Sequence, residues 1–470
     1  MMNVYNSLTR RNEELKPLAE NTVRLYTCGP TVYNFAHIGN FRAYAFEDIL
    51  RRVILFNGMK IRQAMNLTDV DDKTIRGSNA AKVPLRDYTR TYKDAFFVDL
   101  KKLNIRPAEI YPAATDHIPE MIALVQKLME KGVAYQSEDG SVYFKVREFP
   151  GYGKLAHIDF DNQRTGLRCA SDEYDKENVG DFALWKSWEE SDGPVAWDSP
   201  WGKGRPGWHI ECSAMAMKYL GETFDLHTGG IDNLFPHHEN EIAQAEAATG
   251  KEFVRTWMHC AHLRVNGEKM SKSLGNFFTL RDLLDKGYTG REIRYVLVNA
   301  HYRSGLNFAF SALDDARKSL ARIDAAVERV EKLEVGPADG SGEMPEFAKT
   351  ALEKFTAAVN DDLNLPKAFA ALFELVRDTN AALSSEEPLN FSTSQLLNSF
   401  RRMDEVLGVI FFGNEKKAAE IPAEIQLMLD ERAAARKAKN WAESDRLRDA
   451  IAAAGWLVTD SKDGQGCVRK

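Results

Sequence analysis

The stretch VRLYTCGPTVYNFAHIGNFRAYAFEDILRRVILFNGMKIRQAMN, residues 23–66, decides the fold. Residues 23–28 are mostly apolar and are followed by Gly-Pro, which predicts a short buried strand. Residues 38–56 have the length and apolar spacing of a helix that ends at Asn-Gly, and residues 60–66 predict a second strand. This order is a βαβ unit, so we expect a parallel sheet whose ligands bind at the carboxyl ends of the strands.

Residues suited to ligands stand at those strand ends. Cys28 closes the first strand, and Thr68 follows the second. His37, Gly39 and Asn40 belong to the tetrapeptide HIGN at the start of the helix. Free backbone N–H groups and the helix dipole favour an anion there, and a glycine permits close approach of a base or a phosphate. Taken alone, the tetrapeptide is a weak signal, and a lone cysteine is typical of a small buried apolar residue.

A second stretch, GWHIECSAMAMKYLGETFDLHTGGIDNLFPHHENE at residues 207–241, carries metal-ligand chemistry. Residues 236–248 predict a helix on which His237 and Glu241, four apart, share one face. Together with Cys212 they suit a borderline-soft divalent ion, usually zinc. Three ligands leave a tetrahedral site incomplete, and Cys28 at the sheet rim is the candidate for the fourth.

The same stretch leaves alternatives open. His238 and Glu239 compete for the ligand role, because they neighbour the proposed pair. His227, followed by Thr-Gly-Gly and then Asp232, fits a ligand site at a strand end better than an apolar core. The order HHENE differs from HExxH, which disfavours a metalloprotease.

The composition indicates a large soluble protein with two to four domains. The chain has 470 residues, of which 44% are hydrophobic and 28% charged, and its net charge is −7. A nucleic-acid partner would therefore need local basic patches. Five scattered cysteines argue against a disulfide framework and for a reducing compartment. The N-terminus lacks a secretory signal and no apolar run reaches membrane-spanning length, so we expect a cytoplasmic protein without membrane contact.

The middle of the chain predicts two helices, a hairpin and an insertion. The helices are expected at residues 85–103 and 117–131, and the hairpin at residues 133–146. Residues 149–206 are rich in Gly, Pro, Asp and Trp, and we interpret them as an insertion between the two halves of the sheet. Its four tryptophans are expected to pack it: Trp185, Trp188, Trp197 and Trp201. Residues 253–265 predict a further strand region.

A polar loop, NGEKMSKSLGN at residues 266–276, follows the sheet region. It carries Lys269 and Lys272. A lysine pair in a loop is usually only solvated. Two ammonium groups on a mobile loop between a sheet domain and helices nevertheless suit triphosphate charge that moves during a reaction.

The last third predicts helices. They are expected at residues 311–333, 347–383, 395–409, 423–439 and 441–454, before a short strand at 456–459 and a turn at 463–464. The last two helices carry cations and one aromatic side chain among acidic residues: Arg432, Arg436, Lys439 and Trp441. Composition alone favours a solvated helix face, although such residues can also contact an unpaired RNA loop.

These motifs together resemble the class I aminoacyl-tRNA synthetases and, among them, the cysteinyl-tRNA synthetases. HIGN resembles the HIGH signature, and KMSKS at residues 269–273 matches its partner signature in full. The segments YTCGPTVY, NLTDVDDK, GWHIECSAM, FPHHENEIAQ and ARKAKNWAESD extend the resemblance in order along nearly the whole chain. Asn40 departs from the second histidine of HIGH, and its amide can donate a neutral hydrogen bond but cannot become a cation.

The resemblance implies one zinc ion per chain, held by Cys28, Cys212, His237 and Glu241. The substrate cysteine thiolate would bind this zinc, which would reject serine without an editing domain. The implied substrate pocket adds Thr68, Trp208 and His227.

The resemblance also implies ATP with Mg²⁺, L-cysteine and the tRNA for cysteine as partners of a monomeric enzyme. Around ATP, the resemblance implies phosphate contacts by His37 and Asn40 and an adenine contact by Gly39. It implies Gly229 and Asp232 at the ribose, and Lys269 and Lys272 at the pyrophosphate. The implied anticodon contacts are Arg432, Arg436, Lys439 and Trp441.

The expected fold class is α/β: a Rossmann-like parallel-sheet catalytic domain with an insertion, then an α-helical bundle and a small C-terminal anticodon-binding domain. Residues 1–132 and 207–265 are expected to form the two halves of the catalytic domain, separated by the insertion (connective peptide) at residues 133–206. The KMSKS junction is expected at residues 266–310, the helical bundle at 311–410 and the anticodon-binding domain at 422–470. Two alternatives remain. A related ligase that joins cysteine to an amino-sugar has no use for the C-terminal tail. An inactive RNA- or metal-binding paralogue has no use for the two lysines of the KMSKS loop.

Overall fold

The computed structural model describes residues 2–158, 180–270, 275–333, 343–385, 391–412, 423–437, 440–454, 456–461 and 464–469. The chain divides into two compact units, Met1–Ile410 and Phe411–Lys470, which are considered separately below. Among the described residues, no helix combines the length and the apolar character needed to cross a membrane.

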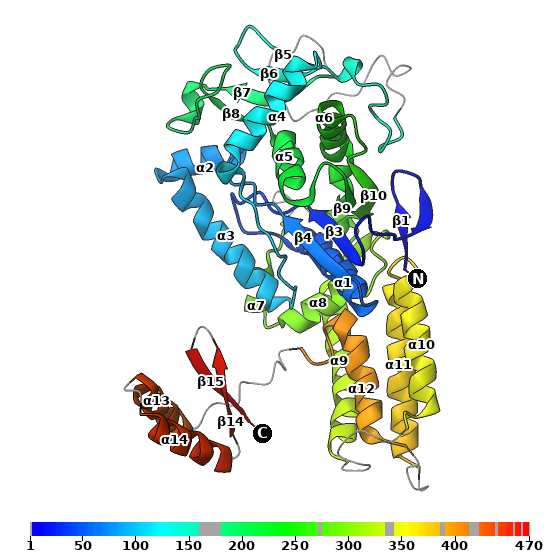
Figure 1. Ribbon diagram of the computed structural model, residues 1–470. Coiled ribbons are helices and arrows are strands. Elements are labelled where there is room, and N and C mark those ends of the chain that lie inside the picture. The colour runs from blue at the N-terminus through cyan, green and yellow to red at the C-terminus, as the bar shows by residue number, and fades with distance from the viewer. Residues whose placement is uncertain are drawn as a thin grey trace. The chain divides into compact units, whose positions relative to one another are not determined.

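A four-stranded parallel sheet with the order β10-β9-β3-β4 lies at the centre of the large unit (Figure 1). Its strands are β3 (Thr22–Thr27), β4 (Lys60–Met65), β9 (Phe224–Gly230) and β10 (Val254–Cys260). Helix α1 (Ile38–Phe56) joins β3 to β4, and both α1 and α5 (Trp208–Leu220) pack against the sheet. The βαβ unit predicted from residues 23–66 is confirmed, with β3 and β4 parallel. The nearly continuous burial of β3 and β9 is typical of parallel strands covered on both faces.

The insertion forms a sheet of its own. Strands β5 (Ala134–Gln136), β6 (Val142–Phe144), β7 (Phe182–Ser187) and β8 (Gly204–Pro206) pair antiparallel in that order. The predicted hairpin is confirmed as β5–β6, whereas β7 and β8 lie in a stretch without clear sequence periodicity. Trp185 is fully buried, but Trp188 is 43% exposed, so the expectation that all four tryptophans pack the insertion is wrong for Trp188.

Around the sheet lie three helices from the first half of the chain, α2 (Asp72–Ala81), α3 (Leu85–Lys102) and α4 (Ile118–Glu130), with α6 (Glu239–Thr249) from the second. The predicted helix over 236–248 begins irregularly, because a π-helical turn, Leu234–His238, with a non-helical Phe235 precedes α6. The predicted strand region 253–265 divides into β10 and β11 (Leu263–Val265). β11 belongs to another sheet, between β12 (Glu268–Lys269) and β13 (Leu306–Phe308).

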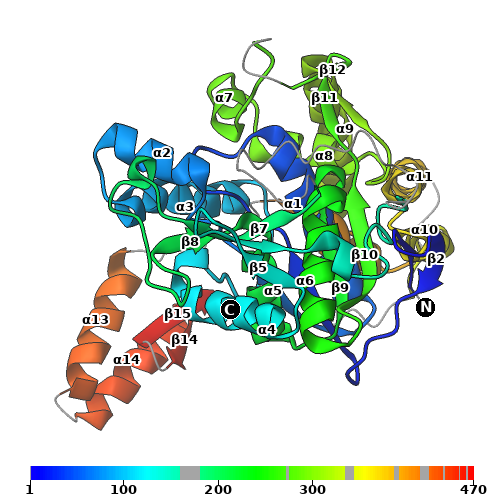
Figure 2. The same ribbon diagram turned by 90° about the horizontal axis from the view of Figure 1, so that it is seen from above.

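The helical part of the large unit begins with two short helices, α7 (Leu280–Asp285) and α8 (Gly290–Val298). The bundle then consists of α9 (Phe310–Glu331), α10 (Glu346–Asn360), α11 (Leu365–Leu383) and α12 (Thr393–Leu407). Figures 1 and 2 both show α10 and α11 side by side. The single helix predicted over 347–383 is therefore wrong.

The break between α10 and α11 has a physical cause at Asp362. Asp362 and Leu363 adopt positive φ angles of 53° and 54°, which end the helix. The Asp362 carboxylate accepts hydrogen bonds from the Tyr5 backbone N–H (2.9 Å) and the Tyr302 hydroxyl (2.6 Å). Arg303 adds an ion pair at 2.6 Å. Partners so distant in sequence hold the N-terminal hairpin, β1 (Asn3–Asn6) and β2 (Arg11–Glu14), to the bundle.

Buried arginines bind the C-terminal end of α12. Arg294 is fully buried, and its Nε donates to the Leu407 carbonyl oxygen at 2.9 Å. Its charge is matched by Asp48 of α1 at 2.6 Å, and Asp48 also pairs with Arg52 at 2.7 Å. Cations favour the negative end of a helix dipole, so this cluster fixes α12 to α1.

The small unit consists of two helices and a hairpin. Its elements are α13 (Ala423–Lys437), α14 (Trp441–Ala453), β14 (Trp456–Ser461) and β15 (Gly464–Arg469). The predicted strand is confirmed as β14, and its pairing with β15 extends the predicted turn into an antiparallel hairpin. Side chains from α13, α14 and β14 form its core: Ile425, Leu429, Ile451 and Trp456.

Candidate metal and nucleotide site

Four side chains from separate parts of the chain converge on one point at the carboxyl end of the sheet. Cys28 follows β3, Cys212 lies on α5, His237 lies in the turn before α6, and Glu241 lies on α6. One potential ligand atom from each lies within 4.8 Å of those of the other three. Cys212, His237 and Glu241 are at most 1% exposed, and Cys28 is 9% exposed. The predicted convergence of these four residues is therefore present in the structure.

Two further histidines orient the members of this cluster. His209 Nδ1 lies 2.8 Å from His237 Nδ1, which leaves His237 Nε2 directed at Glu241 Oε1, 3.0 Å away. His227 Nε2 lies 3.0 Å from the other carboxylate oxygen, Glu241 Oε2. Both oxygens of the buried Glu241 carboxylate therefore face an imidazole nitrogen. A buried carboxylate beside two thiols and an imidazole nitrogen fits a divalent metal ion.

The structure distinguishes between His238 and Glu239, the two alternative ligands raised from the sequence. His238 belongs to a second possible grouping with Cys28, His227 and Glu241. Its Nε2 lies 3.3 Å from Cys28 Sγ, and its Nδ1 is 2.9 Å from His259 Nε2.

Glu239, in contrast, is occupied elsewhere. Its carboxylate accepts hydrogen bonds from the backbone N–H groups of Gly153 (2.8 Å), Leu155 (3.0 Å) and Ala156 (2.9 Å). It therefore anchors the insertion to α6, and the expectation that it competes for the ligand role is wrong.

The electrostatics of the cluster favour a thiolate at Cys212 but not at Cys28, whose pKa burial and the neighbouring Cys212 raise well above its ordinary value. Burial alone would raise the pKa of Cys212, but its hydrogen bond with Cys28 and the nearby His237 lower that pKa to about 6. Burial also raises the pKa of Glu241, an effect that His227 and His237 outweigh, so that its pKa is lowered. A thiolate and an ionised carboxylate are the forms that bind a metal.

The N-terminus of α1 lies beside a loop from the second half of the chain. His37 caps the helix, because its Nδ1 accepts from the Asn40 N–H at 3.2 Å while Asn40 Oδ1 accepts from the His37 N–H at 3.1 Å. This reciprocal capping box gives Asn40 a structural role that the sequence comparison with HIGH does not suggest. Burial lowers the pKa of His37, an effect that the negative charge of Asp232 partly opposes. A Cβ on Gly39 would lie 3.1 Å from Met270 Cε.

The predicted pocket residues surround the cluster. Thr68 donates its hydroxyl to Glu211 Oε2 at 2.8 Å, and in the described chain the other oxygen of this buried carboxylate has no hydrogen-bond partner. Trp208 is 40% exposed and stacks on His237, with ring centroids 4.3 Å apart. Sequence reasoning missed His209 and Glu211, although both share the first turns of α5 with Cys212, and His209 stands three residues before it on the same helix face.

A third missed residue, Glu47 on α1, lies beneath the end of β9. Its Oε1 accepts from the Thr228 hydroxyl at 3.1 Å, and in the described chain Oε2 has no hydrogen-bond partner. Burial raises the pKa of Glu47 well above its ordinary value, which the Thr228 hydrogen bond reduces only in part. Nothing in the local sequence distinguishes Glu47 from an ordinary solvated helix residue.

Other predicted site residues lie as follows. A Cβ on Gly229 would come within 2.8 Å of His238 Cε1, so this glycine permits close packing at the end of β9. Lys269 is exposed at the end of β12, whereas Lys272 lies outside the described residues.

The predicted anticodon contacts lie in the small unit. Trp441 is 60% exposed, and Arg436 is half-buried. Arg432 is only 3% exposed, so the expectation that it contacts RNA is corrected to a role in packing. Lys439 lies outside the described residues.

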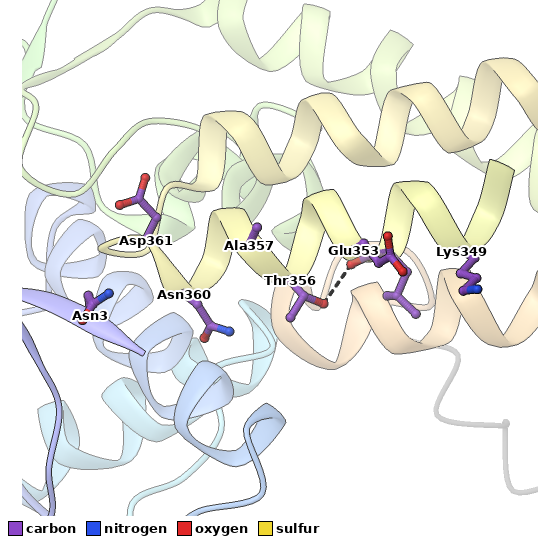
Figure 3. A pocket seen from close by; sticks show the side chains of 8 residues that line it. Asn3, Lys349, Glu353, Thr356, Ala357, Asn360 and Asp361 are labelled. Carbon is purple, nitrogen blue, oxygen red and sulfur yellow. Dashed lines mark hydrogen bonds between the residues drawn. The ribbon is translucent and has the colours of Figure 1, made fainter. Parts of the chain in front are cut away.

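A surface hollow lies on a different part of the large unit (Figure 3). It is bounded by one face of α10 and by Asn3 of β1. Its charged residues are Lys349 and Glu353 on α10 and Asp361 just after that helix. Thr356 there donates to the Leu352 carbonyl within its own helix. The hollow holds neither cysteine nor histidine, so the buried cluster is the better candidate for chemistry.

Comparison with known proteins gives three family matches in chain order. Residues 14–318 match the tRNA synthetases class I (C) catalytic domain, residues 354–412 the DALR domain, and residues 418–467 the cysteinyl-tRNA ligase anticodon binding domain. The cysteine–tRNA ligase of Protochlamydia amoebophila is 50% identical over 98% of this chain and 97% of its own length. That of Chlamydia pneumoniae is 48% identical over 98% and 96%.

Solved structures with the same fold include class I synthetases of other specificities. Mycobacterium tuberculosis methionyl-tRNA synthetase in complex with methionyl-adenylate matches with a TM-score of 0.57 and 16% identity, over 83% of this chain and 90% of its own. The ternary complex of Agrobacterium radiobacter LeuRS with tRNA and LeuAMS matches with a TM-score of 0.56 and 12% identity, over 84% of each chain.

Proposed function

Because the chain belongs to the cysteine–tRNA ligases, class I aminoacyl-tRNA synthetases that join cysteine to tRNA with ATP, we propose that its buried Cys/Cys/His/Glu cluster holds one zinc ion that selects cysteine. The observation that carries the proposal is the convergence of Cys28, Cys212, His237 and Glu241 within 4.8 Å. Two thiols, one imidazole and one carboxylate are ligands that zinc accepts in a tetrahedral site. When bound, zinc would favour the sulfur of cysteine over the hydroxyl of serine.

The chain's own residues support such a site from outside. His209 fixes the ring of His237 through Nδ1, and His227 holds one oxygen of Glu241. Partners of this kind set the tautomer and the orientation of metal ligands. Trp208 covers His237 at the mouth, and Thr68 with Glu211 borders the pocket beside Cys212. We assign these residues to the substrate pocket.

The proposed chemistry needs alignment and charge stabilisation. The cysteine carboxylate is already a nucleophile, so its attack on the α-phosphate of ATP, which expels pyrophosphate and forms the adenylate, requires no general base. We propose that His37 and Asn40 contact phosphate at the N-terminus of α1, beside Gly39 for adenine. Asp232, after Gly229, is proposed to bind the ribose. Lys269 and Lys272 are proposed to stabilise the pyrophosphate, with Mg²⁺ accompanying the ATP.

Metal content and cysteine-dependent ATP–pyrophosphate exchange test the zinc proposal. The purified enzyme is expected to contain one zinc per chain and to exchange with cysteine far better than with serine. Cys212→Ser should lose both the zinc and the discrimination. Cys260→Ser is the matched control, because Cys260 is a buried free cysteine outside the cluster. Enzyme that is free of zinc yet fully selective contradicts the proposal.

The proposal assigns amino-acid activation to residues 1–310 and anticodon reading to residues 422–470. Support comes from the match of residues 418–467 to an anticodon-binding domain and from the exposed ring of Trp441. Arg436 and Lys439 are proposed to contact phosphates beside it. Deletion of the chain after Phe411 is expected to spare exchange and to weaken tRNA charging. An equal loss of both activities contradicts this division.

The proposal also includes a monomeric enzyme in the cytoplasm. The support for the compartment is that three buried cysteines, Cys28, Cys212 and Cys260, are free of disulfides. Light scattering on the purified enzyme tests the monomer, and a dimer mass contradicts it.

A further inference from the structure

A row of aromatic side chains lies on the surface between β3 and α1 and on α3. Tyr33 and Phe35 are both 36% exposed. Tyr92 meets Phe35 edge to face at a centroid distance of 5.3 Å, and Tyr88 meets Tyr92 in the same way at 5.2 Å. The Tyr88 hydroxyl donates to the Tyr33 carbonyl oxygen at 2.9 Å, which fixes the loop against α3. These four residues are called the aromatic platform below.

Cations lie over two rings of the platform. Lys73 Nζ is 5.2 Å from the centroid of the Tyr33 ring, and the Arg281 guanidinium is 4.4 Å from that of Phe35. Asp99 holds Arg281 in place at 2.6 Å. Exposed rings combined with positive charge are suited to a ligand that has both flat faces and negative charge.

The platform adjoins the candidate site on two sides. Next to Tyr33, the Val32 N–H donates to the carbonyl oxygen of the pocket residue Thr68 at 3.0 Å. Beyond Phe35, the His37 ring meets Phe277 at a centroid distance of 5.2 Å. The partners of Tyr33 and Phe35 come from α2 (Lys73), α3 (Tyr88 and Tyr92) and α7 (Arg281), helices that are labelled in Figure 2. The loop that carries Tyr33 and Phe35 is therefore bonded to the segment of Thr68 and leads directly to His37.

We propose that the aromatic platform stacks the unpaired nucleotides at the 3′ end of the tRNA as they enter the site. The inference rests on the established activity, which requires that the accepting end of a tRNA reach the activated cysteine. Unpaired bases present free faces that stack on aromatic side chains, and the adjacent phosphates attract cations. The two cations and the direct continuity with the pocket favour this occupant over a protein partner.

Binding of two tRNAs tests the proposal: intact tRNA, and the same tRNA without its unpaired 3′ nucleotides. The parent enzyme is expected to bind the intact form more tightly. Tyr33→Ala and Phe35→Ala should each weaken intact binding by about 5- to 150-fold, the range for loss of one stacked base, and leave binding of the shortened form unchanged. Phe35→Leu keeps the apolar volume without the ring and should behave as Phe35→Ala, which separates stacking from folding defects.

Ring-retaining variants serve as controls. Tyr33→Phe and Phe35→Tyr should retain the preference for intact tRNA, as should Val98→Ala, a substitution at a 50% exposed position on the same helix as Tyr88 and Tyr92. Equal weakening of both tRNAs by the alanine variants, or no preference in the parent enzyme, overturns the proposal and assigns the platform to duplex RNA or another partner. Cysteine-dependent exchange, which needs no tRNA, tests the proposed zinc and ATP roles separately.

Discussion

The hydrogen bond between His209 and His237 makes a sharp prediction about metal affinity. His209 is 3% exposed, and its Nδ1 lies 2.8 Å from His237 Nδ1. His209→Phe removes this partner and leaves the ring of His237 free to turn away from Glu241. Loss of such an orienting partner typically lowers metal affinity about 10- to 100-fold, or about 1.4 to 2.8 kcal/mol. Competition with a chromophoric zinc chelator measures this directly.

The control for this experiment is a second buried histidine. His117 is 4% exposed, and its two ring nitrogens contact the Ala113 carbonyl oxygen at 2.7 Å and the Tyr219 hydroxyl at 2.9 Å. His117→Phe should therefore destabilise the metal-free enzyme about as much as His209→Phe. Only His209→Phe should lose zinc affinity. With zinc present, its free energy of unfolding should fall further, by as much as its free energy of zinc binding is reduced. Unchanged zinc affinity in His209→Phe, or an equal fall in both variants, refutes the reasoning.

Three further predictions concern α1. Asp48→Asn leaves the buried guanidinium of Arg294 without a counter-charge, and urea unfolding should show a loss of about 3 to 5 kcal/mol; a loss below 1 kcal/mol contradicts this. Burial raises the pKa of Glu47, so its carboxyl keeps a proton in the native state above about pH 4.3, where the unfolded state ionises. The free energy of unfolding therefore falls as the pH rises above that value. Glu47→Gln removes this pH dependence. The melting temperature of the variant minus that of the parent enzyme should therefore increase from pH 5 to pH 8, and a difference that stays constant over this range argues against the reasoning. Asn40→Ala removes the side-chain acceptor of the His37 N–H from the capping box and should cost about 0.5 to 1.5 kcal/mol in thermal unfolding, an effect that Asn40→Ser should partly restore.

The sequence predicts best the elements whose determinants are local. Helix α1 begins and ends at its predicted residues, Ile38 and Phe56, because a side-chain cap and an Asn-Gly pair mark its ends. The break between α10 and α11 carries a local signal that the prediction of a single helix overlooks, because Asn364 caps α11 and Pro366 lies in its first turn. The contacts of Asp362 with Tyr5, Tyr302 and Arg303, far away in the chain, could not be predicted. Strands β7 and β8 escape prediction for a similar reason, because short strands are defined by their partners more than by their own pattern.

The candidate site follows the same division. Cys212 stands out by its thiol, and His237 with Glu241 by the helical spacing of an imidazole and a carboxylate. His209 and Glu47 do not, because what distinguishes them is a contact with a residue 28 or 181 positions away.

Asn40 illustrates how structure changes the meaning of a motif. Compared with HIGH, it reads as the loss of a potential cation beside ATP. In the structure its Oδ1 accepts the His37 N–H while its own N–H donates to His37 Nδ1, so the pair closes the first turn of α1. The imidazole Nδ1 that caps the helix is an acceptor, so His37 in this state is neutral and carries its one ring proton on Nε2. In the proposed ATP complex, phosphate stabilisation at this helix end would therefore come from backbone N–H groups, from Nε2 of His37, from the side-chain NH2 of Asn40 and from the KMSKS lysines. It follows that substituting Lys269 should slow activation more severely than substituting Asn40 by serine.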